Sequence, residues 1–177
     1  MKLLPIIIAA CATCAAVAQT APPPWEWSDE EIALAVNRVR AGRDLSPAHW
    51  PGNARLAVLL SFDVDTETSW LRNGDTNVGG LSQGQYGSRV ALGRILTLLN
   101  EHEIPASFFG PAVSFSLAPE MIPAIQASGR HEIGIHGWIH ERNAELPRAD
   151  EARLLQQAVE RMTKLVGKRP VGYRAPS

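Results

Sequence analysis

Short apolar runs alternate with longer amphipathic stretches along most of this chain, and the alternation constrains its fold more than any other feature. The run from Leu56 to Phe62 is apolar almost without interruption, as is typical of a strand buried on both faces. The predicted strands are 56–62, 106–109, 132–135 and 171–174, and the helices predicted between them are 88–102, 119–128 and 150–166. Strands that alternate with helices imply right-handed crossovers and a parallel sheet, either an open doubly wound sheet or part of a barrel.

The length of the alternating region limits the choice between these two architectures. An eight-stranded barrel takes about 250 residues. The alternating region, 56–177, is about half as long, and it stops directly after the fourth predicted strand. If the fold is a barrel, we therefore expect this chain to be a fragment that is truncated after the fourth strand.

The N-terminus has the pattern of a cleaved secretory signal over residues 1–18, with an apolar run followed by the small residues Ala16–Ala18. The apolar run is too short for a transmembrane helix, which needs about 20 apolar residues. We therefore expect a mature chain that begins near Gln19 and is secreted or periplasmic. Cys11 and Cys14 both lie in the removed segment, and an alternative interpretation is a lipoprotein signal that leaves Cys11 lipidated.

Residues 19–55 form a predicted spacer with one short helix. The proline-rich segment 21–25 is stiff and extended, so it cannot pack as a helix or a central strand. Ser28 followed by Glu31 is a capping box, which predicts a helix over 28–41. This helix is interpreted as a packing appendage.

Composition excludes some classes of partner. The chain has 17 Lys+Arg against 18 Asp+Glu and a formal net charge of −1, without a basic block. Nucleic acids and anionic membranes need clustered Lys and Arg, so neither is an expected partner. The stretch from Asn73 to Ser88 is rich in Gly and Asn but has no phosphate-binding pattern, and it is predicted to be a long loop at the rim of the sheet.

Five polar residues fall where a parallel sheet would place a binding site. Asp63 and Asp65 end the first predicted strand, His136 and His140 follow the third, and Arg174 ends the fourth. Two acids spaced by two residues point to the same side of an extended strand, where they need a cation or a proton between them. Two His spaced by four share one face if the segment turns helically as it leaves the strand.

This set of side chains is typical of a catalytic metal site. One carboxylate with two imidazoles gives three ligands and leaves positions open for water and substrate. The second carboxylate is then free to act as a base, because a zinc-type ion lowers the pKa of bound water to about 7. Arg174 would hold that base ionised through a charge-assisted pair. An iron oxygenase would use similar ligands, but the β-α alternation disfavours it.

Three segments carry a resemblance to a known family. The segments 61–65 (SFDVD), 136–140 (HGWIH) and 174–177 (RAPS) resemble the first three motifs of the polysaccharide deacetylase (NodB-homology) family. The resemblance implies an α/β fold, a distorted (β/α) barrel of which 56–177 would be the N-terminal part. It implies hydrolysis of an acetamide on an amino sugar. It also implies a divalent metal ion as cofactor, with zinc as the first candidate and cobalt, nickel or manganese as alternatives.

The resemblance also implies a role for each residue of the set. Asp63 would be the catalytic base with Arg174 as its partner, and Asp65, His136 and His140 would be the metal ligands. The histidine that protonates the leaving amine in the family would lie beyond the end of this chain.

Two departures from the family pattern keep alternatives open. Val64 separates two acids that are usually adjacent, and this variant is similar to a branch that contains peptidoglycan deacetylases and allantoinase-like hydrolases of cyclic amides or imides. Gly137 replaces the usual Ser or Thr. The first hypothesis is a deacetylase of a peptidoglycan or chitin-like polysaccharide, the second a hydrolase of a small cyclic amide, and the third an inactive fragment or carbohydrate-binding relic.

Overall fold

The structure is a computed structural model that describes residues 22–38 and 46–176. The chain divides into two compact units, Met1–Ala54 and Arg55–Ser177. The signal segment predicted over 1–18, with both cysteines, lies outside the described residues. No helix in the described part of the chain combines the length and the apolar character needed to cross a membrane.

In the first unit, residues 22–38 and 46–54 contain short helices only. These are η1 (Pro24–Glu26), α1 (Asp29–Asn37) and η2 (Pro51–Asn53). The predicted capping box is confirmed, because the Glu31 N–H donates to the Ser28 hydroxyl at 3.2 Å and the Ser28 N–H donates to the Glu31 carboxylate at 2.7 Å. Helix α1 ends at Asn37, before the predicted end at residue 41, and none of its residues is buried.

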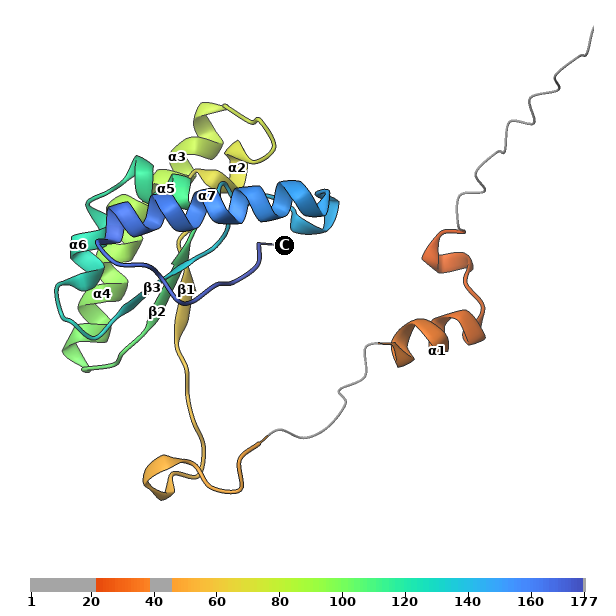
Figure 1. Cartoon of the computed structure of the whole chain (residues 1–177), viewed down its shortest axis with the longest axis horizontal. Helices are drawn as coiled ribbons and strands as arrows, with labels where there is room; N and C mark the ends of the chain where they lie inside the picture. Colours follow the sequence, from red (N-terminus) through yellow and green to blue (C-terminus); the bar gives the residue numbers. More distant parts are fainter. Residues whose placement is uncertain (1–21, 39–45, 177) are drawn as a thin grey trace, which may run out of the picture. The chain divides into compact units, whose positions relative to one another are not determined.

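The second unit is an α/β fold around a parallel sheet, as the alternation predicts (Figure 1). Its elements are β1 (Ser61–Asp63), α2 (Thr68–Leu71), α3 (Val78–Tyr86), η3 (Gly87–Ala91), α4 (Leu92–Glu101), β2 (Ser107–Gly110), α5 (Ala112–Leu117), α6 (Met121–Gln126), β3 (Glu132–Ile135), η4 (Asn143–Glu145) and α7 (Arg148–Val166). The sheet has the order β1-β2-β3, and both strand pairs are parallel. The core lies between the sheet and the helices, with Phe108 of β2 and Met162 of α7 fully buried.

The first predicted strand is shorter than expected. Strand β1 begins at Ser61 rather than at Leu56, and Leu56 and Leu59 have exposed fractions of 65% and 82%. Within the described residues, β1 pairs with β2 along one edge only. The apolar run was a correct sign of a strand, but its first residues have no neighbouring strand with which to pair in the part of the chain that the structure describes.

The last predicted strand is present as an extended segment with little regular pairing. The Ile135 N–H donates to the Gly172 carbonyl and the Arg174 N–H donates to the Ile135 carbonyl, both at 2.9 Å. These bonds form a single parallel bridge between Ile135 and Tyr173. They are sufficient to hold Arg174 beside the end of β3.

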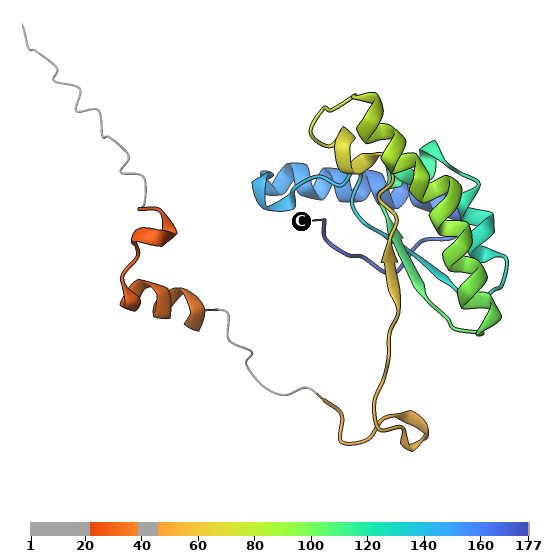
Figure 2. The ribbon, with the colours of Figure 1, turned by 180° about the vertical axis from the view of Figure 1, so that it is seen from behind.

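The prediction of a long loop over 73–88 is wrong, because most of this stretch is helical. Helix α3, the π-helical segment η3 and α4 follow one another as a nearly continuous rod (Figure 2). A Cβ at Gly80 would lie 2.4 Å from the Trp70 ring, and a Cβ at Gly84 would lie 2.7 Å from the Glu67 backbone. The glycines therefore allow close packing of α3 on the turn after β1 and do not mark a flexible loop.

Candidate metal centre

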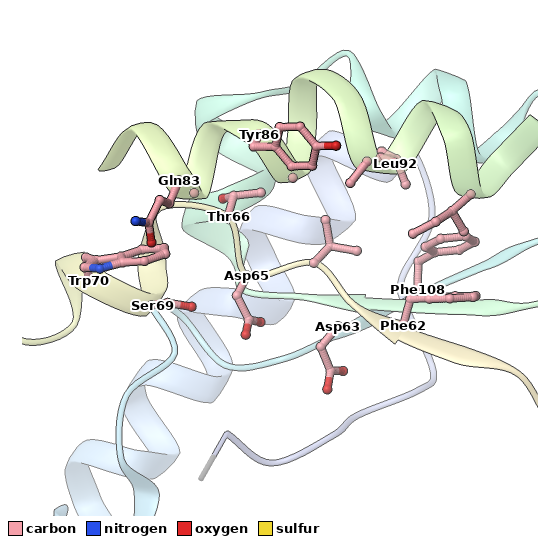
Figure 3. Close-up of a pocket in the computed structure, with 15 residues that line it drawn as sticks. Phe62, Asp63, Asp65, Thr66, Ser69, Trp70, Gln83, Tyr86, Leu92 and Phe108 are labelled. Atoms are coloured by element: carbon pink, nitrogen blue, oxygen red, sulfur yellow. The ribbon is translucent and has the colours of Figure 1, made fainter. Parts of the chain in front are cut away.

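The two acids of the first motif lie at the carboxyl end of β1. Asp63 is the last residue of the strand, and Asp65 follows after the buried Val64. The carboxylates of both acids point to the same side, as the two-residue spacing predicts (Figure 3). Hydrogen bonds from the Thr68 hydroxyl and the Ser114 hydroxyl, each 2.5 Å long, fix the Asp65 carbonyl oxygen.

The two histidines lie in the loop that follows β3. His136 comes directly after the strand, and its N–H donates to the Gly110 carbonyl at 2.9 Å. The segment does not turn helically, as the four-residue spacing suggested, because Gly137 and His140 have positive φ angles of 78° and 63°. This irregular loop nevertheless places the two rings edge to face, with their centroids 4.8 Å apart.

The loops after β1 and β3 together bring three possible ligands into one cluster. The Asp65 Oδ1 atom lies 3.8 Å from His136 Nε2, and Asp65 Oδ2 lies 3.4 Å from His140 Nε2. One ligand atom from each residue falls within 4.8 Å of the others. Both histidines are buried, at 4% and 8% exposure.

The cluster fits a divalent ion on two grounds. Asp65 Oδ1 is buried and has no hydrogen-bond partner in the structure, so a carboxylate oxygen is available inside the cluster. The donor set of one carboxylate oxygen and two imidazole nitrogens is one that zinc and similar ions accept. Burial raises the pKa of the Asp65 carboxyl, and the neighbouring His140 and His136 oppose this shift.

His136 is oriented for metal binding through its second ring nitrogen. Its Nδ1 atom lies 2.9 Å from the Arg174 carbonyl oxygen, which can only accept a hydrogen bond. Nδ1 therefore carries the proton, and the lone pair of Nε2 faces Asp65. A bond of this kind fixes both the tautomer and the ring orientation of a metal-binding histidine.

His140 has a different partner, which the sequence did not reveal. Its Nδ1 atom lies 2.6 Å from Nη1 of Arg72, at the end of α2. A guanidinium group only donates hydrogen bonds, so Nδ1 accepts here and the proton of a neutral ring lies on Nε2. His140 can bind an ion through Nε2 only when this contact breaks and the proton moves to Nδ1. Arg72 is 68 positions from His140, and no motif or spacing in the sequence links the two.

The remaining two predicted residues form an ion pair beside the cluster. Arg174 Nη1 donates to Asp63 Oδ1 at 2.5 Å, and Nη2 donates to the Ser61 hydroxyl at 2.6 Å. The guanidinium also lies over the Phe109 ring, 4.5 Å from its centroid. The structure thus brings together all five residues of the predicted set, with Asp63 outside the three-residue cluster.

A pocket of about 360 Å³ lies next to β1, and both Asp63 and Asp65 contribute to its lining. Its lining includes Thr66, Tyr86 and Leu92, which lie on the opposite side of the strand from the Asp63 and Asp65 carboxylates (Figure 3). Neither of the clustered histidines lines it. The pocket therefore meets the candidate site at the two acids, while most of its apolar lining lies on the other side of β1.

The matches to a sequence model, to a relative and to a solved structure indicate the same family. The sequence model of a family described as polysaccharide deacetylase matches residues 85–177, just over half of the chain. Peptidoglycan deacetylase of Helicobacter pylori is 32% identical over 123 residues, which cover 68% of this chain and 42% of that protein. A candidate polysaccharide deacetylase of known structure from Mycobacterium smegmatis is 35% identical, with a TM-score of 0.67 over 75% of this chain and 48% of that one.

A structure of the allantoinase PuuE is also similar, at 29% identity and a TM-score of 0.65, over 76% of this chain and 53% of that one. The chain spans about half the length of the relatives it matches, or less. Fold and cluster together define an α/β domain with a candidate metal site at the carboxyl edge of a parallel sheet. With the family match, the chain belongs to the polysaccharide deacetylase family, and the fold class predicted from the sequence is confirmed.

Proposed function

We propose that the protein is a metal-dependent hydrolase that removes N-acetyl groups from an amino-sugar polysaccharide. The observation that carries this proposal is the cluster of Asp65, His136 and His140 beside the Asp63–Arg174 ion pair, in a chain of the polysaccharide deacetylase family. The reaction adds water to an acetamide and yields acetate and a free amine on the sugar.

Each residue of the set has a role in this proposal. Asp65, His136 and His140 would hold a divalent ion, with zinc as the first candidate. The ion would supply Lewis-acid activation of a water molecule and of the amide carbonyl. Asp63 takes the proton of the attacking water as general base. Arg174 keeps Asp63 ionised and oriented, since its guanidinium donates to the carboxylate at 2.5 Å.

Peptidoglycan is the first substrate class to test. The Helicobacter relative is named a peptidoglycan deacetylase, and it is 32% identical to this chain. A glycan outside the cytoplasm also agrees with the export that the N-terminal pattern predicts. We propose cleavage after Ala18, and mass spectrometry of the mature N-terminus tests it: a start at Gln19 supports cleavage, whereas a lipidated Cys11 would indicate a lipoprotein.

A small cyclic amide is the second candidate substrate, because the PuuE structure, named an allantoinase, resembles this chain with a TM-score of 0.65. The same cluster and the same base would serve this reaction, since both reactions hydrolyse an amide bond with activated water. The two candidates therefore differ in the substrate and not in the residues that act on it.

The deciding experiment is acetate release by the zinc-loaded protein from N-acetylglucosamine oligomers and from peptidoglycan, beside hydrolysis of a cyclic imide. We expect acetate, together with loss of turnover on chelation and its return with added zinc. Hydrolysis of the imide alone would support the second candidate. Glycan binding without any turnover, and independent of metal, would instead support a carbohydrate-binding relic.

A further inference from the structure

The loop that carries both clustered histidines is irregular, so its shape depends on specific contacts. Strand β3 ends at Ile135, and the positive φ angles of Gly137 and His140 exclude a helical turn over this segment. Backbone groups in such a loop lack the regular partners of a helix or a sheet. The positions of the two imidazole rings therefore depend on whatever binds these groups.

Helix α5 binds the carbonyl oxygens on one side of this loop. The Ala112 N–H donates to the Gly137 carbonyl at 3.1 Å, and the Val113 N–H donates to the Trp138 carbonyl at 3.0 Å. These two donors belong to the first turn of the helix, whose N–H groups have no partner within the helix itself.

The side chain of Glu141 binds the N–H groups of the same loop. The Trp138 N–H donates to both carboxylate oxygens, at 3.0 Å and 2.9 Å, and the Ile139 N–H donates to Oε2 at 2.8 Å. Hydrogen bonds to an ionised acceptor are roughly twice as strong as bonds between neutral groups. One carboxylate thus binds two of the three amide N–H groups that lie between the clustered histidines.

The close fit around this carboxylate explains the glycine at position 137. A Cβ at Gly137 would lie 2.9 Å and 3.0 Å from the Glu141 oxygens and 2.7 Å from Cγ of Pro176, and the φ angle of 78° also disfavours any other residue. Gly137 is therefore required by the positive φ angle and by the space that Pro176 and the Glu141 carboxylate occupy.

We propose that Glu141 is a positioning residue of the metal centre: its carboxylate folds the loop so that His136 and His140 present their Nε2 atoms to one ion. The inference rests on the proposed function, because it takes the cluster as a metal site. Glu141 directly follows His140 in the chain, so a change in how its carboxylate binds the loop shifts the backbone of that ligand. Glu141 itself does not contact substrate in this proposal.

The test compares Glu141→Gln with Glu145→Gln as a matched control. Glu145 lies four positions further along, has a largely exposed side chain and pairs with Arg142. The measurements are zinc affinity, by competition with a chelator, and the visible spectrum of the Co²⁺-substituted protein, which reports ligand geometry. Glu141→Gln should bind zinc about 10–100-fold more weakly and change the Co²⁺ spectrum, while Glu145→Gln leaves both unchanged.

Unchanged zinc affinity and an unchanged Co²⁺ spectrum in Glu141→Gln would overturn the inference and leave the proposed function standing. If the wild-type protein bound neither Zn²⁺ nor Co²⁺, the proposed function would fall and the inference with it. Glu141→Asp retains the charge and should recover part of the lost affinity, which a general loss of stability would not explain.

Amide hydrogen exchange in the wild-type protein gives a second measurement that does not depend on a variant folding. The Trp138 and Ile139 amides should exchange slowly although they lie in a loop, because the Glu141 carboxylate binds them. Exchange of both amides at the rate of an unstructured peptide would overturn the inference.

Discussion

A histidine flanks strand β3 at each end, and the two histidines have different surroundings. His136, at the carboxyl end, donates to the Arg174 carbonyl and faces the Asp65 carboxylate and the His140 ring. His131, at the amino end, lies 3.2 Å from the Asn100 amide oxygen and packs edge-on against Phe108.

The difference follows from the direction of the strands. Parallel strands end together at one edge, so loops from β1 and β3 and the segment after α7 meet at the carboxyl edge and gather charged side chains there. At the amino edge, burial lowers the pKa of His131, and the nearby Arg130 adds to the shift. Burial alone therefore favours a neutral packing histidine, while a carboxylate and a second imidazole are needed to make a ligand.

The sharpest test of this contrast is His136→Ala beside His131→Ala. His136→Ala should abolish stoichiometric zinc binding, since loss of a group that merely orients a ligand already costs about 10–100-fold in affinity. His131→Ala should leave zinc affinity unchanged. Equilibrium dialysis with metal analysis measures both, and equal loss in the two variants would show that the effect comes from the fold and not from the cluster.

The second test separates the base from the ligands at the carboxyl edge. Asp63→Asn should lower kcat by about 10²–10⁴-fold, the usual contribution of a general base, while zinc affinity stays near that of the wild type. Acetate release measures kcat, and chelator competition on the same preparation measures zinc affinity. A variant that lost its zinc would show that Asp63 is a ligand, contrary to the assignment of Asp65.

The third test concerns the partner of His140. Arg72→Gln should raise zinc affinity by roughly tenfold or less, because the guanidinium holds Nδ1 as an acceptor and adds a positive charge worth about 1 kcal/mol in a partly solvated site. Chelator competition measures the change. Weaker zinc binding in this variant would contradict the expectation that Arg72 and zinc compete for His140. It would show instead that Arg72 helps to hold His140 in position for the ion.

The smallest effect is expected at the amino edge. Because burial lowers the pKa of His131 below 6.5, the unfolded chain takes up a proton as the pH falls through that value and the folded chain does not. His131 therefore lowers the stability of the folded state as the pH falls, and this effect is absent well above pH 6.5. His131→Gln should reduce the drop in Tm between pH 7.5 and pH 5.5 by roughly 1–2 °C, and an unchanged drop would count against it.

The sequence predicted the parts of the fold that depend on local patterns. The order of elements, the capping box at Ser28 and the placement of Asp63, His136 and Arg174 at strand ends all follow from periodicity and spacing. It failed where tertiary contacts decide. Helix α3 is rich in glycine, a poor helix former, and it forms where only glycine leaves room for the Trp70 ring.

The same reasoning applies to the site. The four-residue spacing correctly paired His136 with His140, but the mechanism it suggested, a helical turn, is wrong, because two positive φ angles shape the loop instead. Arg72 reaches His140 from α2 through folding alone, so no spacing rule could have found it. The roles of the five residues as base, partner and ligands remain predictions.

The two hydrogen bonds between α5 and the histidine loop limit how this domain can be rebuilt. Ala112 and Val113, in the first turn of α5, donate those bonds to the loop after β3, so the shape of that loop depends on the start of the helix. A chimera that exchanged the HGWIHE segment alone with that of a relative would pair it with a foreign helix start. For protein engineers, the transferable unit is therefore the loop after β3 together with the first turn of α5.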